Sequence, residues 1–129
     1  MATLTLTERV SVNGFSFEKA TTYSASGVRT IEDTVANGQT DKQVNIGIDV
    51  SQVAFFMIYS DKAVTVETNS GSSPTNTLNL LAGVPHIWKG ASDLYAFKLT
   101  GDVTTSIFIT NASGATANIT IVLIDDATV

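Results

Sequence analysis

The chain has 129 residues, of which 12 are acidic, 7 are basic and one is histidine, so its formal net charge at pH 7 is −5. It contains no cysteine, which excludes disulfide scaffolds, cysteine-based zinc sites and cysteine nucleophiles. The basic residues are few and scattered, and phosphate binding needs clustered lysine and arginine. We therefore expect no nucleic-acid partner.

Charged residues make up 15% of the chain, against about 25% in a typical soluble domain. A surface so poor in charge suits burial against other subunits, because exposed apolar patches usually mark contact sites. A neutral, threonine-rich β surface without a partner is the alternative. No run approaches the ~18 apolar residues of a transmembrane helix, and the N-terminus lacks the pattern of a signal peptide, so we expect no membrane partner.

Residues 1–27 are predicted to be an N-terminal arm or a first hairpin. Two alternating runs, Leu4 to Val12 and Phe15 to Phe17, flank the turn signal Asn13-Gly14. The apolar residues change from even to odd positions across this turn, which fits a β-hairpin or an arm that leaves the domain body.

The leading run supplies the candidate partner-contact residues. A proline-free alternating strand can add to an open sheet edge of a neighbour. The candidates are Thr3, Leu4, Thr5, Leu6 and Thr7. Glu8 and Arg9 are expected to interrupt the apolar face and to limit aggregation. The alternative is that the run is the first strand of the sandwich itself.

Residues 28–129 are predicted to form a β-sandwich domain. Apolar and polar residues alternate from Val44 to Val50, which is typical of a strand with one buried face. The runs Val53 to Tyr59 and Ile119 to Ile124 are apolar throughout and predict central strands covered on both faces. Turn signals recur at intervals of roughly 8–14 residues. The pattern predicts an all-β, antiparallel, jelly-roll-like sandwich of about 8–10 strands with essentially no helix.

No motif predicts catalysis, a cofactor or a metal. His86 is the sole histidine and has no recognisable nucleophile motif. An oxygen-ligand calcium site is the remaining metal alternative, with Asp125-Asp126, Glu32-Asp33 and the pair Asp93 and Asp102 as candidates. Neighbouring carboxylates in a strand point to opposite faces, however, so surface charges are the expected role.

Aromatic residues raise one further alternative. Trp88 and Tyr95 are candidate glycan or interface aromatics, since exposed rings can form a platform for a sugar. They can equally fill the core of a small β domain, which is the more common place for large aromatic side chains. Paired carboxylates for glycoside hydrolysis cannot be singled out, because such a pair is defined in space.

The C-terminal part resembles a known group of proteins. Trp88 lies in a short predicted strand after Pro85. The run Leu99 to Ile109 leads into the polar segment Thr110 to Asn118, and an apolar strand then ends at Asp125-Asp126-Ala127-Thr128. This pattern resembles small structural proteins of tailed-bacteriophage virions, especially head decoration (cement) proteins with jelly-roll-like sandwiches.

The resemblance implies a shell-stabilising protein of the virion, often a homotrimer seated outside the capsid. Its partner would be the major capsid protein or another virion protein. A carbohydrate- or receptor-binding β-sandwich module of a phage tail or fibre is the alternative. A hydrolase with spatially assembled carboxylates is a third hypothesis.

Overall fold

The computed structural model describes residues 2–25, 27–89 and 99–125. These residues form ten β-strands and one turn of 3-10 helix, η1 (Val50–Gln52). The strands are β1 (Ala2–Val12), β2 (Phe15–Ala25), β3 (Gly27–Val35), β4 (Lys42–Asn45), β5 (Val53–Ser60), β6 (Val64–Thr68), β7 (Thr77–Leu80), β8 (His86–Trp88), β9 (Ser106–Thr110) and β10 (Ala117–Asp125). The predicted all-β class and strand number are confirmed. In the described ranges, no helix is long and apolar enough to cross a membrane.

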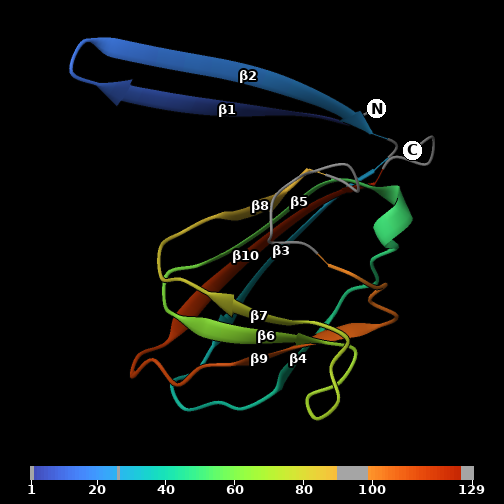
Figure 1. Ribbon diagram of the computed structural model, residues 1–129. Helices are drawn as coiled ribbons and strands as arrows, with labels where there is room; N and C mark the ends of the chain where they lie inside the picture. Colours follow the sequence, from blue (N-terminus) through green and yellow to red (C-terminus); the bar gives the residue numbers. More distant parts are fainter. Residues whose placement is uncertain (1, 26, 90–98, 126–129) are drawn as a thin grey trace.

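Eight of these strands form two antiparallel four-stranded sheets that face each other as a β-sandwich (Figure 1). One sheet has the order β3-β10-β5-β8 and the other the order β4-β9-β6-β7. The pairs are nested: β3 pairs with β10, β4 with β9, β5 with β8 and β6 with β7. Apart from the β6–β7 hairpin, every connection from β3 onward passes between the two sheets.

The core lies between the two sheets and is built by the alternation seen in the sequence. β10 contributes Ile119, Ile121 and Leu123 to the core, and β6 contributes Val64 and Val66. These side chains are all at most 5% exposed. Burial of fully apolar side chains of this size stabilises the fold by about 1.5–3 kcal/mol each relative to an exposed position.

The alternating segment Val44 to Val50 begins as a strand but ends differently from the prediction. Val44, Ile46 and Ile48 are buried as expected, and Ile46 and Ile48 donate backbone hydrogen bonds to the segment before β9. Val50, however, opens η1 instead of continuing the strand. The side chain of Asp49 accepts a hydrogen bond from the backbone N–H of Ser51, so a local cap competes with the strand.

Asn111 is a buried polar residue that ties the β9–β10 loop to the end of β3. Its side chain is fully buried, and its Nδ2 donates to the carbonyl oxygens of Val35 at 2.9 Å and Ala115 at 2.7 Å. Its Oδ1 accepts from the backbone N–H of Ser113 at 3.0 Å. Because each buried polar atom has a partner, the asparagine stabilises this end of the sandwich and carries no penalty of unsatisfied burial.

The two apolar runs of the sequence form the interior strands β5 and β10 of one sheet. One face of these strands packs in the sandwich core. The other face carries Phe55, Met57, Val122 and Ile124, which belong to a second apolar cluster outside the sandwich. The prediction of two covered faces is therefore confirmed, and the cover on the outer face is the N-terminal hairpin.

Candidate assembly surface on the N-terminal hairpin

β1 and β2 form a long hairpin that is a sheet of its own, beside the sandwich (Figure 1). Each strand has 11 residues, and they pair from Ala2 opposite Ala25 to Val12 opposite Phe15. The two turn residues, Asn13 and Gly14, both have positive φ angles, 40° and 86°. A two-residue turn with this geometry matches the twist of the strands, which explains why Asn-Gly is the strongest hairpin signal in a sequence.

The hairpin has one apolar and one polar face. Directly opposed residues of an antiparallel pair point to the same side. The register thus places even positions of β1 and odd positions of β2 together. The apolar face carries Leu4, Leu6, Val10, Val12, Phe15, Phe17 and Tyr23. The opposite face carries Thr3, Thr5, Thr7, Arg9, Ser11, Ser16, Glu18, Ala20 and Thr22.

The base half of the apolar face is seated on the sandwich. Leu4, Leu6 and Tyr23 pack against the cluster centred on Phe55 and Ile124. The rings of Tyr23 and Phe55 lie 5.5 Å apart, centroid to centroid, at an interplanar angle of 52°. This tilted geometry is favourable for aromatic pairs. The base is therefore held to its own domain by apolar contacts.

An ion pair marks the end of the seated half. Glu8 lies on the apolar face, after Leu6, and its Oε1 is 2.7 Å from Nζ of Lys89, the residue after β8. The expectation that Glu8 interrupts the apolar face is confirmed. The same expectation for Arg9 is wrong, because the register turns Arg9 to the polar face, with its Nε 4.0 Å from Oε2 of Glu18.

The turn end of the hairpin extends away from the sandwich (Figure 1), and the apolar residues that follow Glu8 are exposed. Val10 is 57% exposed, Val12 56%, Phe15 61% and Phe17 53%. They form two cross-strand pairs, Val10 with Phe17 and Val12 with Phe15. A large aromatic side chain has about 150–250 Å² of surface, so the four expose on the order of 400 Å² together. The largest apolar patch of a typical monomer has this size and is often functional.

The predicted contact residues are divided by this geometry. Leu4 and Leu6 are half-buried against their own domain, so their side chains are not free for a partner. Thr3, Thr5 and Thr7 are exposed on the polar face. The exposed tip residues were not among the predicted contact residues. The sequence does contain a signal for them: if Asn13-Gly14 is taken as a two-residue turn, the alternating runs on its two sides place valines opposite phenylalanines.

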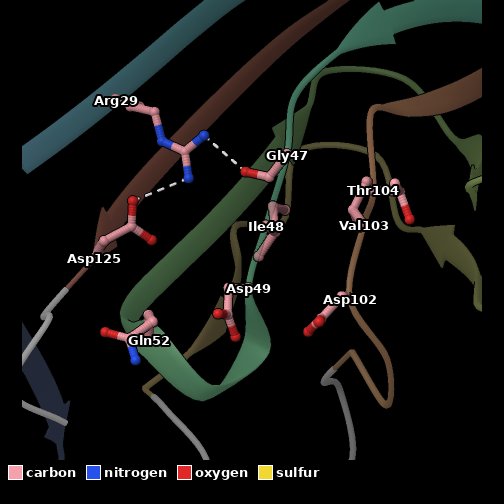
Figure 2. Close-up of a pocket in the computed structure, with 9 residues that line it drawn as sticks. All are labelled: Arg29, Gly47, Ile48, Asp49, Gln52, Asp102, Val103, Thr104 and Asp125. Carbon is pink, nitrogen blue, oxygen red and sulfur yellow. Dashed lines mark hydrogen bonds and ion pairs between the residues drawn. The ribbon is translucent and has the colours of Figure 1, made fainter.

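A polar hollow of about 550 Å³ lies at one end of the sandwich (Figure 2). Arg29 spans it, donating to the carbonyl oxygen of Gly47 at 2.7 Å and to Oδ2 of Asp125 at 2.9 Å. Asp49 accepts from the backbone of Ser51 at 3.0 Å, and Asp102 accepts from the backbone N–H of Val50 at 2.9 Å. These three carboxylates hold loops and a strand end together.

Those candidate calcium ligands that the structure describes do not gather into a metal site. Within residues 2–25, 27–89 and 99–125, no group of three or more histidine and acidic side chains is placed to hold a metal ion. Asp33 instead accepts from Nζ of Lys42 at 2.8 Å and from the backbone of Thr34. These two hydrogen bonds, first that of Lys42, lower the pKa of Asp33. Asp93 and Asp126 lie outside the described residues.

His86 begins the edge strand β8 and has a structural contact. Its Nε2 accepts a hydrogen bond from the backbone N–H of Leu81 at 3.1 Å, across the β7–β8 turn. Partial burial disfavours the charged imidazolium and lowers the pKa of His86. The ring thus lies at a strand edge two residues from Trp88, with one nitrogen engaged by the backbone.

Trp88 does not lie on the surface. Its side chain is 2% exposed and belongs to the sandwich core, so its ring cannot serve as a sugar platform. Its Nε1 has no acceptor in the described structure. The other candidate aromatic, Tyr95, lies outside the described residues. The core alternative given by the sequence is the correct one for Trp88, because a large ring at an inward position of β8 fills the space between the sheets.

No protein-family model, curated protein or solved structure matches this chain. The function is therefore argued from the geometry of the molecule. Two features bear on it most directly: the open apolar tip of the hairpin, and the structural use of the carboxylates in the polar hollow.

Proposed function

We propose that this chain is a non-enzymatic structural protein of a virion, a capsid decoration or cement protein that stabilises a phage head. It binds the outer surface of the head as a homo-oligomer, with a trimer expected, and its partner is the major capsid protein or another virion protein. The observation that carries the proposal is the exposed apolar tip of a hairpin held at its base, which is a surface built for contact with another chain.

The strand pairing supports the proposal. A set of nested pairs, from β3 with β10 inward to β6 with β7, is what results when one long hairpin is wrapped around a core. This arrangement is that of an eight-stranded jelly roll, an architecture used by viral capsid and lectin domains. The pairing is consistent with the proposal, and the function itself is argued from the hairpin tip, because one fold is shared by proteins of unrelated function.

The polar groups also support a structural role. The carboxylates of Asp49, Asp102 and Asp125 each accept a hydrogen bond from the chain itself. A general acid or base needs a carboxyl group poised to exchange protons with a substrate. Groups that cap a helical turn or bind an arginine stabilise loops instead.

The test uses particles of the virus that carries this sequence. Mass spectrometry and immunogold labelling of gradient-purified particles should find the chain on the outside of DNA-filled heads. Heads that lack the chain should release DNA at a lower temperature, and added purified chain should restore their stability. The proposal is overturned if the chain is absent from particles, or if it labels only the tail.

A further inference from the structure

The sequence contains two Asn-Gly pairs, and each lies in a turn. Asn13-Gly14 is the turn of the N-terminal hairpin, and Asn37-Gly38 is a turn after β3. Asparagine is a chemically labile residue. It is most labile before glycine, because glycine has no side chain to hinder the approach of its own backbone nitrogen. Since the two pairs have the same reacting groups, a difference in their lability must come from the structure around them.

The reaction is an attack within the pair. The backbone nitrogen of the glycine loses its proton to a base in solution and bonds to Cγ of the asparagine, and the side-chain nitrogen leaves as ammonia. Water then opens the cyclic imide that has formed. Cleavage of the new N–Cγ bond gives aspartate, and cleavage of the original peptide bond gives isoaspartate, in which the main chain runs through Cγ. In both cases one water is consumed, one ammonia is released and an amide becomes a carboxylate.

The hairpin turn leaves the attacking nitrogen accessible. The flanking pair of Val12 and Phe15 closes the loop, and no described group accepts a hydrogen bond from the N–H of Gly14. Asn13 and Gly14 are both exposed. Apart from the adjacent residues of the chain, no described atom lies within 4 Å of the position that a Cβ on Gly14 would take. Solvent base and the side chain of Asn13 can therefore reach this nitrogen.

The hairpin turn can also open at low cost. Ring closure requires Asn13 to leave its turn conformation, in which φ is 40°. Among the described residues, the tip is held by the ladder between two strands, and a two-stranded hairpin by itself is marginally stable in water. Val12 and Phe15 are 56% and 61% exposed, so little buried contact is lost when the end of the ribbon frays.

The turn at Asn37 is tied to the sandwich. The backbone N–H of Gly38, the attacking group, donates to the carbonyl oxygen of Asn111 at 2.8 Å. The backbone N–H of Asn111 donates in turn to the carbonyl oxygen of Gln39 at 2.9 Å. Asn111 is fully buried, so opening this turn would leave buried polar groups without partners, which is unfavourable. The reactive conformation is therefore much rarer at Asn37 than at Asn13.

We infer that Asn13 is a site of spontaneous deamidation and that the fold protects Asn37, although a glycine follows both residues. The inference goes beyond the proposed function and does not rest on it, because it concerns the chemistry of the free chain. The co-reactant is water, and the reaction is faster in alkali because the attacking nitrogen must first lose a proton.

The products change the tip of the hairpin in two ways. Aspartate adds one negative charge, to a chain of net charge −5, beside the exposed pair of Val12 and Phe15. An Asp-Gly pair still fits the two-residue turn. Isoaspartate adds a methylene to the main chain of this turn, and so removes the geometry that sets the register of the hairpin.

The first test compares the two asparagines within one chain. The purified full-length chain is incubated in dilute, mildly alkaline buffer, with and without denaturing urea, and peptide mapping by mass spectrometry gives the rate at each site. The rate in urea divided by the native rate measures the protection that the fold gives. Protection at Asn37 should exceed that at Asn13 by at least about tenfold, since about 1.4 kcal/mol, of the order of one hydrogen bond, is a factor of ten.

A matched pair of variants gives a second measurement. Asn13→Asp and Asn37→Asp each remove one amide and keep the shape of the side chain, and circular dichroism checks that both are folded. In native buffer Asn13→Asp should remove most of the ammonia that the chain releases, and Asn37→Asp should leave the release unchanged. Equal protection of the two sites, or stronger protection of Asn13, would overturn the inference. Ammonia release that Asn13→Asp leaves unchanged would also overturn it, because the reactive asparagine would then lie elsewhere.

Discussion

The base and the tip of the hairpin share one backbone ladder and one alternation, yet they have opposite surroundings. In the base, Leu4, Leu6 and Tyr23 rest on the outer face of β5 and β10. In the tip, Val10, Val12, Phe15 and Phe17 face solvent. The difference teaches that a period-two pattern determines which side of a ribbon is apolar, whereas the chain beneath it determines whether that side is buried.

The largest expected effect on stability comes from deleting the whole hairpin, and it is to be compared with the effect of removing the tip alone. Deleting residues 1–25 uncovers Phe55 and Ile124, so the free energy of unfolding should fall by about 3–5 kcal/mol and the chain should aggregate more readily. Replacing residues 9–18 by Asn-Gly keeps the Glu8–Lys19 pair next to a two-residue turn. The free energy of unfolding of this shortened chain should differ from that of the wild type by less than about 0.5 kcal/mol.

Urea denaturation followed by circular dichroism measures both values. Equal loss of stability in the two variants would show that the tip is as much a part of the domain as the base, and the distinction between the halves would fail.

Single aromatic substitutions sharpen the same distinction. Tyr23→Ala removes a half-buried ring that contacts Phe55 at a centroid distance of 5.5 Å, and should cost about 2 kcal/mol. Phe17→Ala, on the same strand and the same face, should cost less than about 0.5 kcal/mol in the monomer, because its ring is 53% exposed. Thermal melting at low protein concentration gives both numbers. The interpretation of the base fails if the order is reversed.

The boundary between the halves should matter little to stability. Glu8 and Lys89 form an ion pair at 2.7 Å with side chains 48% and 30% exposed. An exposed pair of this kind contributes at most about 1 kcal/mol, and less at high salt. Glu8→Gln should therefore lower the melting temperature by a few degrees or less. A loss that exceeds that of Tyr23→Ala would show that the ion pair, and not the apolar seat, holds the hairpin.

Lowering the pH should destabilise the molecule through groups of the sandwich and not through the hairpin tip. The pKa of His86 is lowered by burial, so its contribution to stability is complete above the unfolded value of about 6.5 and is lost as the pH falls from there. The pKa of Asp33 is lowered by Lys42, so its contribution is lost in a second step, below about pH 4.

Melting temperatures from pH 8 to pH 3 and an NMR titration of the His86 ring measure these two steps. The His86→Gln variant, whose amide oxygen can still accept from Leu81, should lack the first step. The chain with the shortened hairpin should keep both steps. A histidine pKa above 6.5 would contradict the expected direction of the shift.

Much of the molecule was predictable from local pattern. The hairpin followed from Asn13-Gly14 between two alternating runs, because this turn needs two positive φ angles that these residues adopt readily. The strands β5 and β10 followed from short, β-branched and aromatic runs. The site was predicted less well: the candidates Leu4 and Leu6 are the seated residues, and the exposed ones follow after Glu8.

The sequence by itself determined which residues alternate, where the chain turns and that two strands would be covered on both faces. Only the tertiary structure decided which parts of the chain pack over those faces. It nested β3 with β10 and β6 with β7, buried Trp88 between the sheets, and brought Lys89 to Glu8 where the seated half of the hairpin ends. The reason is physical: alternation is a property of neighbouring residues on one strand, whereas burial depends on which distant parts of the chain come to lie against it.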